Sequence, residues 1–277
     1  MLRPFLSLYS LALLMFLIIP ILVIVPLSFN EGSFLSYPLS GLSLRWYHEF
    51  FNSGDWMPAL LNSLKIAPAA TLLATVFGTF ASVGLSRGEF RGKAVIMAII
   101  ISPMIAPVVI VAVGLDFFFA SWGLLNSYLG LVIAHAVLGV PFVVITVNAT
   151  LEGYDRNFTR AAASLGATPW YGFKRVTLQL IAPGVLSGAL FAFATSFDEV
   201  VVTLFLASPS QRTLPMQMFA GIKENLNPTI AAAATMMVLG ALLLLLAMEA
   251  LRRRNESIRG HRPGNQALPG RWGCWAT

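Results

Sequence analysis

The sequence predicts an all-α integral membrane protein with six transmembrane helices. Hydrophobic residues make up 57% of its 277 residues and charged residues only 11%, whereas a soluble domain carries about 25% charged residues. Crossing the hydrocarbon layer takes about 20 helical residues, and six apolar stretches are long enough. The predicted spans are residues 6–29, 60–85, 94–119, 128–150, 183–206 and 228–249.

The first span is predicted to be retained rather than cleaved. The chain is apolar from Phe5 to Phe29, which is longer than the roughly 7–15 apolar residues of a signal peptide. No small-x-small cleavage pattern follows before Asn30.

The segment that follows, residues 30–59, is predicted to lie at the outer membrane surface. Its Trp46, Tyr47 and Trp56 are typical of the membrane–water boundary. A short helix lying on the membrane is predicted from the residues that share one helical face, Leu44, Tyr47, His48 and Phe51.

Two features are notable in the third and fourth spans. Pro103 and Pro107 predict a kink in the third, with neighbouring groups bonding the freed carbonyls. His135 and Asn148 in the fourth are assigned no role beyond packing or hydrogen bonding between helices.

The distribution of Lys and Arg predicts that both termini are cytoplasmic, because inner loops carry an excess of these residues. This orientation places 14 of the 18 basic residues inside, and the ratio is still 8 to 4 without the tail. The net charge of +6 is therefore attributed to membrane topology and not to nucleic-acid binding. Residues 1–251 are predicted to form a six-span transmembrane domain, and residues 252–277 a basic, disordered tail. The lone Cys274 excludes an internal disulfide and a thiolate metal site.

The loop between the fourth and fifth spans, residues 151–182, is predicted to form a helix–turn–helix. One face of the first helix is apolar, and Gly166 is a natural helix stop. Thr168 can cap the second helix with Pro169 at its first position. The first helix is too short to be stable alone, so it must dock on something. Its apolar face consists of Phe158, Ala161, Ala162 and Leu165.

The same loop resembles a known signature. Arg160-Ala-Ala-x-x-x-Gly166, followed nine residues later by Val176-Thr-Leu-Gln179, is similar to the EAA---G---------I-LP motif of ABC importer permeases. The chain departs from the motif at two positions, with Arg160 in place of an acid and Gln179 in place of proline. The resemblance implies that the loop is a coupling helix for a cytoplasmic ATPase, with coupling residues Arg160, Ala161, Ala162, Leu165 and Gly166.

Two further segments, residues 196–202 and 212–218, resemble the second permease of spermidine/putrescine importers. Iron, sulfate, molybdate and opine importers remain alternatives for the solute. The resemblance implies two ATPase copies that bind ATP and Mg²⁺, a second permease, a periplasmic binding protein and a bacterial inner-membrane location. No cofactor or metal is expected in this chain, and no nucleic-acid partner.

Three acids in or at the ends of predicted spans are candidates for a cation pathway: Asp116, Asp198 and Glu199. A carboxylate near the middle of a bilayer costs roughly 2.5–3.5 kcal/mol, so a function should offset that cost. At 1.5 Å per residue, Asp198 would lie roughly 23 Å across a straight fifth span, toward the outer side. Capping of helix ends, or pairing with the partner subunit, is the alternative for these acids.

Two other classes of protein are less well supported. A hydrolase needs a nucleophile and a base held together, and no such spacing occurs around His135. A secondary transporter would also use intramembrane acids, but inverted repeats are not found and the loop would be unexplained. No P-loop is present, because Gly88 and Gly92 are separated by three residues where four are needed. The predicted protein is a transport subunit, not an enzyme.

Overall fold

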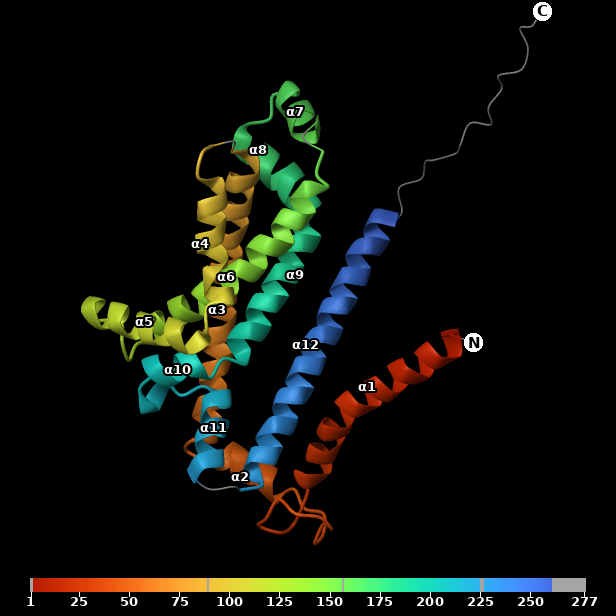
Figure 1. The fold of residues 1–277 in the computed structure, drawn as a ribbon, viewed down its shortest axis with the longest axis vertical. Coiled ribbons are helices and arrows are strands. Elements are labelled where there is room, and N and C mark those ends of the chain that lie inside the picture. Colours follow the sequence, from red (N-terminus) through yellow and green to blue (C-terminus); the bar gives the residue numbers. More distant parts are fainter. Residues whose placement is uncertain (1, 89, 156, 225–226, 261–277) are drawn as a thin grey trace, which may run out of the picture. The chain divides into compact units, whose positions relative to one another are not determined.

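The computed structural model describes residues 2–88, 90–155, 157–224 and 227–260 (Figure 1). The chain divides into two compact units, the first ending at Val238 and the second beginning at Leu239. The described residues are almost entirely helical, and their only extended pairing is an isolated bridge between Asn30 and Leu42.

The helices follow one another with short connections. In chain order they are α1 (Leu2–Leu27), α2 (Arg45–Asn52), α3 (Trp56–Arg87), α4 (Lys93–Ile105), α5 (Val108–Trp122), α6 (Tyr128–Glu152), α7 (Asn157–Ser164), α8 (Pro169–Gly172), a π-helical turn η1 (Phe173–Thr177), α9 (Leu178–Phe197), α10 (Val201–Leu206), a 3₁₀ turn η2 (Pro209–Gln211), α11 (Leu214–Glu224) and α12 (Thr229–Gly260).

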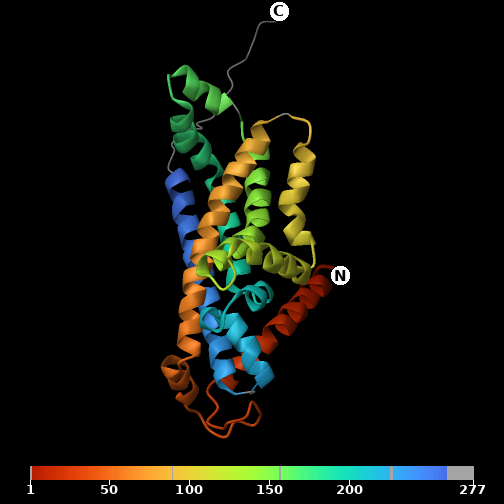
Figure 2. The ribbon, with the colours of Figure 1, turned by 90° about the vertical axis from the view of Figure 1, so that its left-hand side faces the viewer.

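Helices α3, α6 and α9 form the packed centre of the first unit (Figure 2). Small residues stand where these helices cross, as is typical of helix packing in membranes. A Cβ atom on Gly78 would lie 2.7 Å from Cβ of Val143, and one on Gly139 would lie 3.0 Å from Cβ of Ala192 and 3.1 Å from Cβ of Ala74. The close approach of the three backbones therefore depends on the absence of side chains at both glycines.

The third predicted span is strongly bent. α4 and α5 meet at 107°, so the kink expected from the prolines is confirmed. Pro107 has no N–H to donate and drives the residue before it away from the helical region; Ala106 accordingly has ψ 143°. Any depth for Asp116 based on a straight span does not apply.

The fifth predicted span also differs from expectation. Helical structure begins at Pro169, continues through η1 and α9 to Phe197, and breaks before α10. The second helix of the loop is therefore the beginning of the fifth span, and the span predicted over residues 183–206 is interrupted at residues 198–200.

Among the described residues, four helices are long and apolar enough to cross a membrane: Leu6–Leu27, Trp56–Arg87, Tyr128–Glu152 and Pro169–Phe197. The bent pair α4–α5 supplies a fifth if it counts as one span. The start of α12, Thr229–Leu244, is a shorter apolar helix. An all-helical membrane fold is confirmed; six spans and the orientation of the termini stay predictions. The expectation about the tail falls largely on residues 261–277, outside the described residues.

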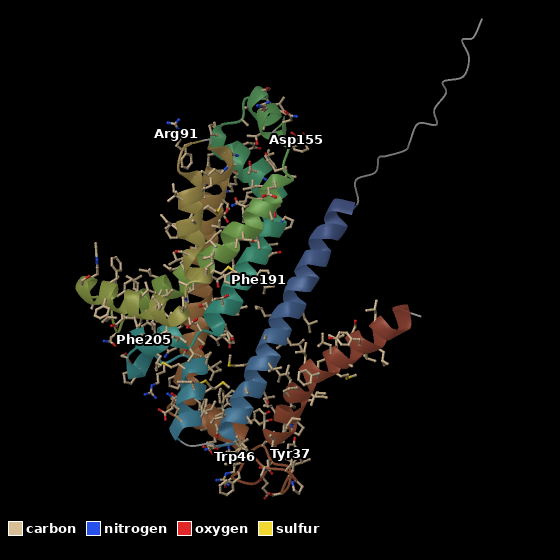
Figure 3. All side chains as sticks on the ribbon, in the orientation of Figure 1. Tyr37, Trp46, Arg91, Asp155, Phe191 and Phe205 are labelled. Atoms are coloured by element: carbon tan, nitrogen blue, oxygen red, sulfur yellow. The ribbon has the colours of Figure 1, made fainter. Side chains whose placement is uncertain are left out.

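The region between α1 and α3 is held together by aromatic side chains (Figure 3). Trp46 Nε1 donates to the carbonyl of Asn30 at 2.6 Å, and Tyr37 donates to the carbonyl of Val23 at 2.9 Å. α2 buries Trp46 and Phe50. The opposite face, with Phe51 45% exposed, includes the residues expected to rest on the membrane.

Candidate functional site

The first candidate site is the short helix α7 with the turn that follows it. Asp155 introduces the helix: its Oδ1 accepts from the N–H of Asn157 at 2.9 Å, and its carbonyl accepts from the N–H of Phe158 at 3.2 Å. Tyr154 and Thr159 are joined through their hydroxyl groups. Local polar groups thus fix where the helix begins.

Gly166 ends α7 in the left-handed conformation, at φ +82°. The N–H of Gly166 donates to the carbonyl of Ala163 at 2.9 Å, and the N–H of Ala167 donates to the carbonyl of Ala162 at 3.1 Å. These two bonds make up a Schellman motif, which favours glycine at this position. Thr168 Oγ1 then accepts from the N–H of Tyr171 at 3.3 Å, with Pro169 at the first helical position. The predicted stop and cap are both present.

α7 buries none of its residues among the described part of the chain. Phe158 is 55% exposed, Leu165 at the end of the helix 89% and Trp170 63%. Ala162 is half-buried, while Ala161 and Arg160 are exposed. Exposed apolar side chains concentrated around a short helix are typical of an interaction surface.

The base of this segment is anchored to the central helices. The Phe173 ring lies 5.6 Å from that of Phe80 on α3 and 5.6 Å from that of Trp170. Arg87, the last residue of α3, donates to Thr177 Oγ1 at 3.1 Å. Because these contacts link α3, α8 and η1, a force applied near α7 would reach the spans.

The second candidate site is the break between α9 and α10. Glu199 Oε1 accepts from the N–H of Val202 at 2.8 Å, so its carboxylate caps α10, as the alternative for these acids anticipates. Asp198 is exposed and ends α9. A carboxylate at a helix C-terminus interacts unfavourably with the helix dipole. Asp198 therefore does not stabilise α9.

Asp116 lies on α5, which packs against α10. Ala112 and Phe119 of α5 belong to the same buried cluster as Val202 and Leu206. The helical spacing 112, 116, 119 puts Asp116, which is half-buried, on this side of α5. The fold thus brings the helix of Asp116 against the element that directly follows Asp198 and Glu199.

His135 also belongs to this site, although the sequence predicts only a packing or hydrogen-bonding role for it. It is 1% exposed, and its two ring nitrogens lie 2.9 Å from Ser196 Oγ and 3.1 Å from Thr203 Oγ1. Ser196 precedes the break and Thr203 follows it, so one imidazole on α6 joins both sides. No spacing in the sequence indicates this contact, because it depends on how α6 meets α9 and α10.

Within the described residues, no group of three or more His, Cys, Asp or Glu side chains could hold a metal ion. The two candidate sites lie at opposite ends of one continuous helix, Pro169–Phe197. The arrangement suits transmission of movement across a membrane rather than covalent chemistry.

Long apolar helices, an exposed short helix between two of them and charged groups at an interrupted span are features of a membrane transport permease. Residues 74–257 match the family described as binding-protein-dependent transport system inner membrane component, and the chain belongs to that family. It is therefore a permease subunit of an ABC importer.

Individual relatives agree with this assignment. The chain is 33% identical to the spermidine/putrescine transport system permease protein PotC of Haemophilus influenzae, covering 87% of this chain and 93% of the relative. It is 33% identical to the putrescine transport system permease protein PotI of Escherichia coli, covering 90% and 92%. Its fold is similar to a chain in the crystal structure of a bacterial alginate ABC transporter in complex with an alginate pentasaccharide-bound periplasmic protein, with a TM-score of 0.71, 17% identity, and coverage of 91% and 94%.

Proposed function

We propose that this permease carries a small cationic solute, a polyamine such as putrescine or spermidine, into a bacterial cell at the expense of ATP. The observation that supports the substrate class is an exposed carboxylate, Asp198, at a break in a membrane span. PotC and PotI, by their names, belong to polyamine systems, and both are similar to this chain over most of its length.

In this proposal the chain works as one member of an inner-membrane complex. Two ATPase copies bind ATP and Mg²⁺, a second permease completes the pathway, and a periplasmic protein delivers the solute. Both termini and the loop 151–182 face the cytoplasm, which matches the excess of Lys and Arg there. The solved alginate importer includes a periplasmic protein, which supports that partner.

Coupling is assigned to α7. Closure of the ATPases would press on Arg160, Ala161, Ala162, Leu165 and Gly166. Movement would pass through Thr177 and the stacked rings of Phe80 and Phe173 into the spans. The exposed apolar side chains of α7 fit a cleft on a partner, which is the main support for this role.

Ala162→Trp tests the docking of α7, because a large ring cannot enter a cleft shaped for a methyl group. We expect transport and stimulation of ATP hydrolysis to be lost while the protein still inserts into membranes. Ser164→Trp is the matched control, since Ser164 is exposed about 200° around the helix from Ala162. Equal activity of the two variants would remove the docking role.

Reconstitution of the complex with its binding protein in liposomes tests the substrate and the energy source. Uptake of labelled putrescine should require ATP inside and should continue after the proton gradient is collapsed. Uptake that stops with the gradient would indicate a secondary transporter instead. Uptake of sulfate or molybdate in place of putrescine would retain the importer and reject the polyamine.

A further inference from the structure

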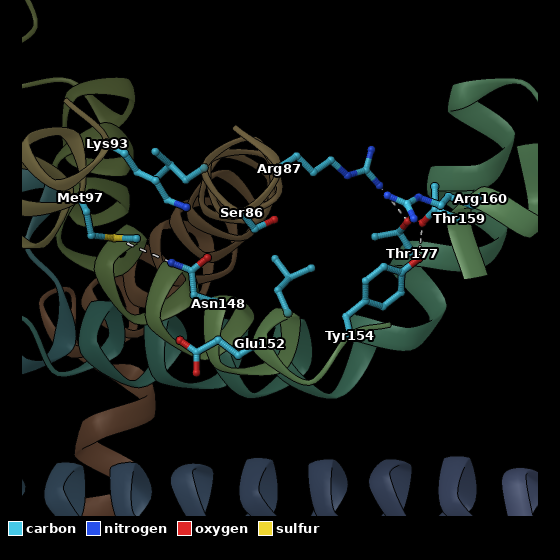
Figure 4. A pocket seen from close by; sticks show the side chains of 12 residues that line it. Ser86, Arg87, Lys93, Met97, Asn148, Glu152, Tyr154, Thr159, Arg160 and Thr177 are labelled. Carbon is cyan, nitrogen blue, oxygen red and sulfur yellow. Dashed lines mark hydrogen bonds between the residues drawn. The ribbon is translucent and has the colours of Figure 1, made fainter. Parts of the chain in front are cut away.

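A cavity of about 610 Å³ lies beside α7, where the ends of α3 and α6 meet the start of α4. This volume falls within the roughly 300–1,000 Å³ of small-molecule sites. Its walls come from the end of α3, the start of α4, the end of α6, α7 and η1, and Figure 4 shows their side chains around the space. Of the residues assigned to coupling, Arg160 alone lines the cavity, so neither solute selection nor ATPase docking accounts for it as a whole.

The cavity is basic. Arg87, Lys93 and Arg160 line it together with a single acid, Glu152. Among the described residues, the side chains of the three cations make one hydrogen bond, from Arg87 to Thr177. In Figure 4 Arg87 and Arg160 lie on one side of the space and Lys93 on the other. Cations that converge from three helices, with donors to spare, favour an anion between them.

A general excess of basic residues on the cytoplasmic side does not explain this convergence. Arg91, Lys174 and Arg175 belong to the same side by sequence, yet none of them lines the cavity. Arg91 lies in the turn after α3 (Figure 3) and is not among the residues that line the cavity. It provides a control with the same charge.

An apolar groove adjoins the basic cavity. It has a volume of about 600 Å³ and runs along one face of α4, and it shares Met97 with the cavity. Spacing of three and four residues keeps its lining on a single face. The lining consists of Ala94, Met97, Ala98, Ile101, Ser102, Ile105 and Ala106.

We propose that the cavity and groove together bind one anionic phospholipid. The headgroup would occupy the cavity, with its phosphate beside Arg87 and Arg160 and with Lys93 across the space, and an acyl chain would follow α4 past Ala98 and Ile101. Basic pockets between membrane helices at the cytoplasmic side bind acidic headgroups. The groove distinguishes a lipid from free phosphate, which has no apolar part. Because Arg160 belongs to the coupling segment, the amount of anionic lipid in the membrane would affect the position of α7.

The orientation in this proposal rests on the proposed function, but its test does not require transport. The complex is purified in mild detergent from membranes that contain phosphatidylglycerol, and bound lipid is counted by native mass spectrometry. Arg87→Gln with Lys93→Gln removes two charges, each contributing about fivefold in affinity, so retention should fall by roughly 25-fold. Ala98→Phe, which blocks the groove, should also lower retention, whereas Arg91→Gln should not.

Equal retention in all variants would overturn the proposal. So would displacement of the bound anion by millimolar inorganic phosphate together with no effect of Ala98→Phe, because the site would then bind phosphate alone. Should the double variant fail to assemble, the wild-type complex in equimolar phosphatidylglycerol and phosphatidylcholine gives the answer: enrichment of the anionic lipid is expected, and equal amounts would reject it. Absence of polyamine uptake would leave this result intact and refute the proposed solute alone.

Discussion

At the scale of single residues, the conformation of Gly166 sets the tightest constraint on the coupling segment. A Cβ atom there would meet nothing within 4 Å. The position therefore excludes other residues through its backbone, at φ +82°, and not through crowding.

A substitution series at Gly166 tests this reasoning. An L-residue in the left-handed region costs about 1–2 kcal/mol, while Asn is tolerated best. ATP hydrolysis stimulated by the binding protein should decrease from glycine to Asn, then Ala, then Val. Membrane insertion should be unchanged. If Val behaved like Asn, the backbone would not be what the turn requires.

Asp198 allows function and stability to be separated. Asp198→Asn removes a charge that is unfavourable at the end of α9 by about 0.3–1 kcal/mol, so the melting temperature should stay the same or rise slightly. Loss of one exposed attraction worth up to about 1 kcal/mol should raise KM for putrescine roughly fivefold. The comparison is Glu199→Ala, which removes the cap of α10 and should lower the melting temperature. Normal uptake kinetics in Asp198→Asn would remove this residue from the pathway.

At the scale of elements, the break between α9 and α10 depends on His135. His135→Leu would leave two buried hydroxyl groups, those of Ser196 and Thr203, without the imidazole partner. The Ser196 hydroxyl is then left without a partner among the described residues, at a cost of about 1–3 kcal/mol, whereas Thr203 Oγ1 keeps its bond to the carbonyl of Glu199 at 3.4 Å. We expect a lower melting temperature and weaker uptake.

A double-mutant cycle separates the hydrogen bonds of His135 from its general packing. Adding Ser196→Ala to His135→Leu removes the stranded hydroxyl, so the pair should be less damaging than the sum of the single changes. Uptake and thermal unfolding are both measured. Simple additivity would show that the imidazole and the hydroxyl do not act together.

The elements that were predicted well are those set by local chemistry. The stop at Gly166 and the cap at Thr168 follow from adjacent residues, and the kink at Pro107 follows from a missing N–H. The interruption at residues 198–200 was signalled only by the adjacent acids Asp198 and Glu199, because the apolar residues on both sides fit one span and the bonds from His135 come from more than sixty positions earlier. The cavity between Arg87, Lys93 and Arg160 was missed for the same reason, since its walls come from separate helices.

At the scale of the whole molecule, the orientation in the membrane can be tested with the single native cysteine, Cys274. A maleimide that cannot cross membranes should label it only after spheroplasts are opened, because the tail is expected inside. Ser36→Cys combined with Cys274→Ser is the control, since Ser36 lies in the exposed loop after α1. It should react in intact spheroplasts, and the opposite pattern would invert the predicted topology.

The uninterrupted helix from Pro169 to Phe197 has one further consequence. Its 29 residues form a rod roughly 43 Å long at 1.5 Å per residue, with the docking segment at one end and Asp198 just past the other. Each residue inserted into such a rod rotates its far end by about 100°. The π-helical turn at residues 173–177 is equivalent to an insertion of this kind. The direction in which Asp198 points is therefore set partly by the helical phase at the η1 end, and restoring regular α-geometry there would turn the acid and separate Ser196 from His135.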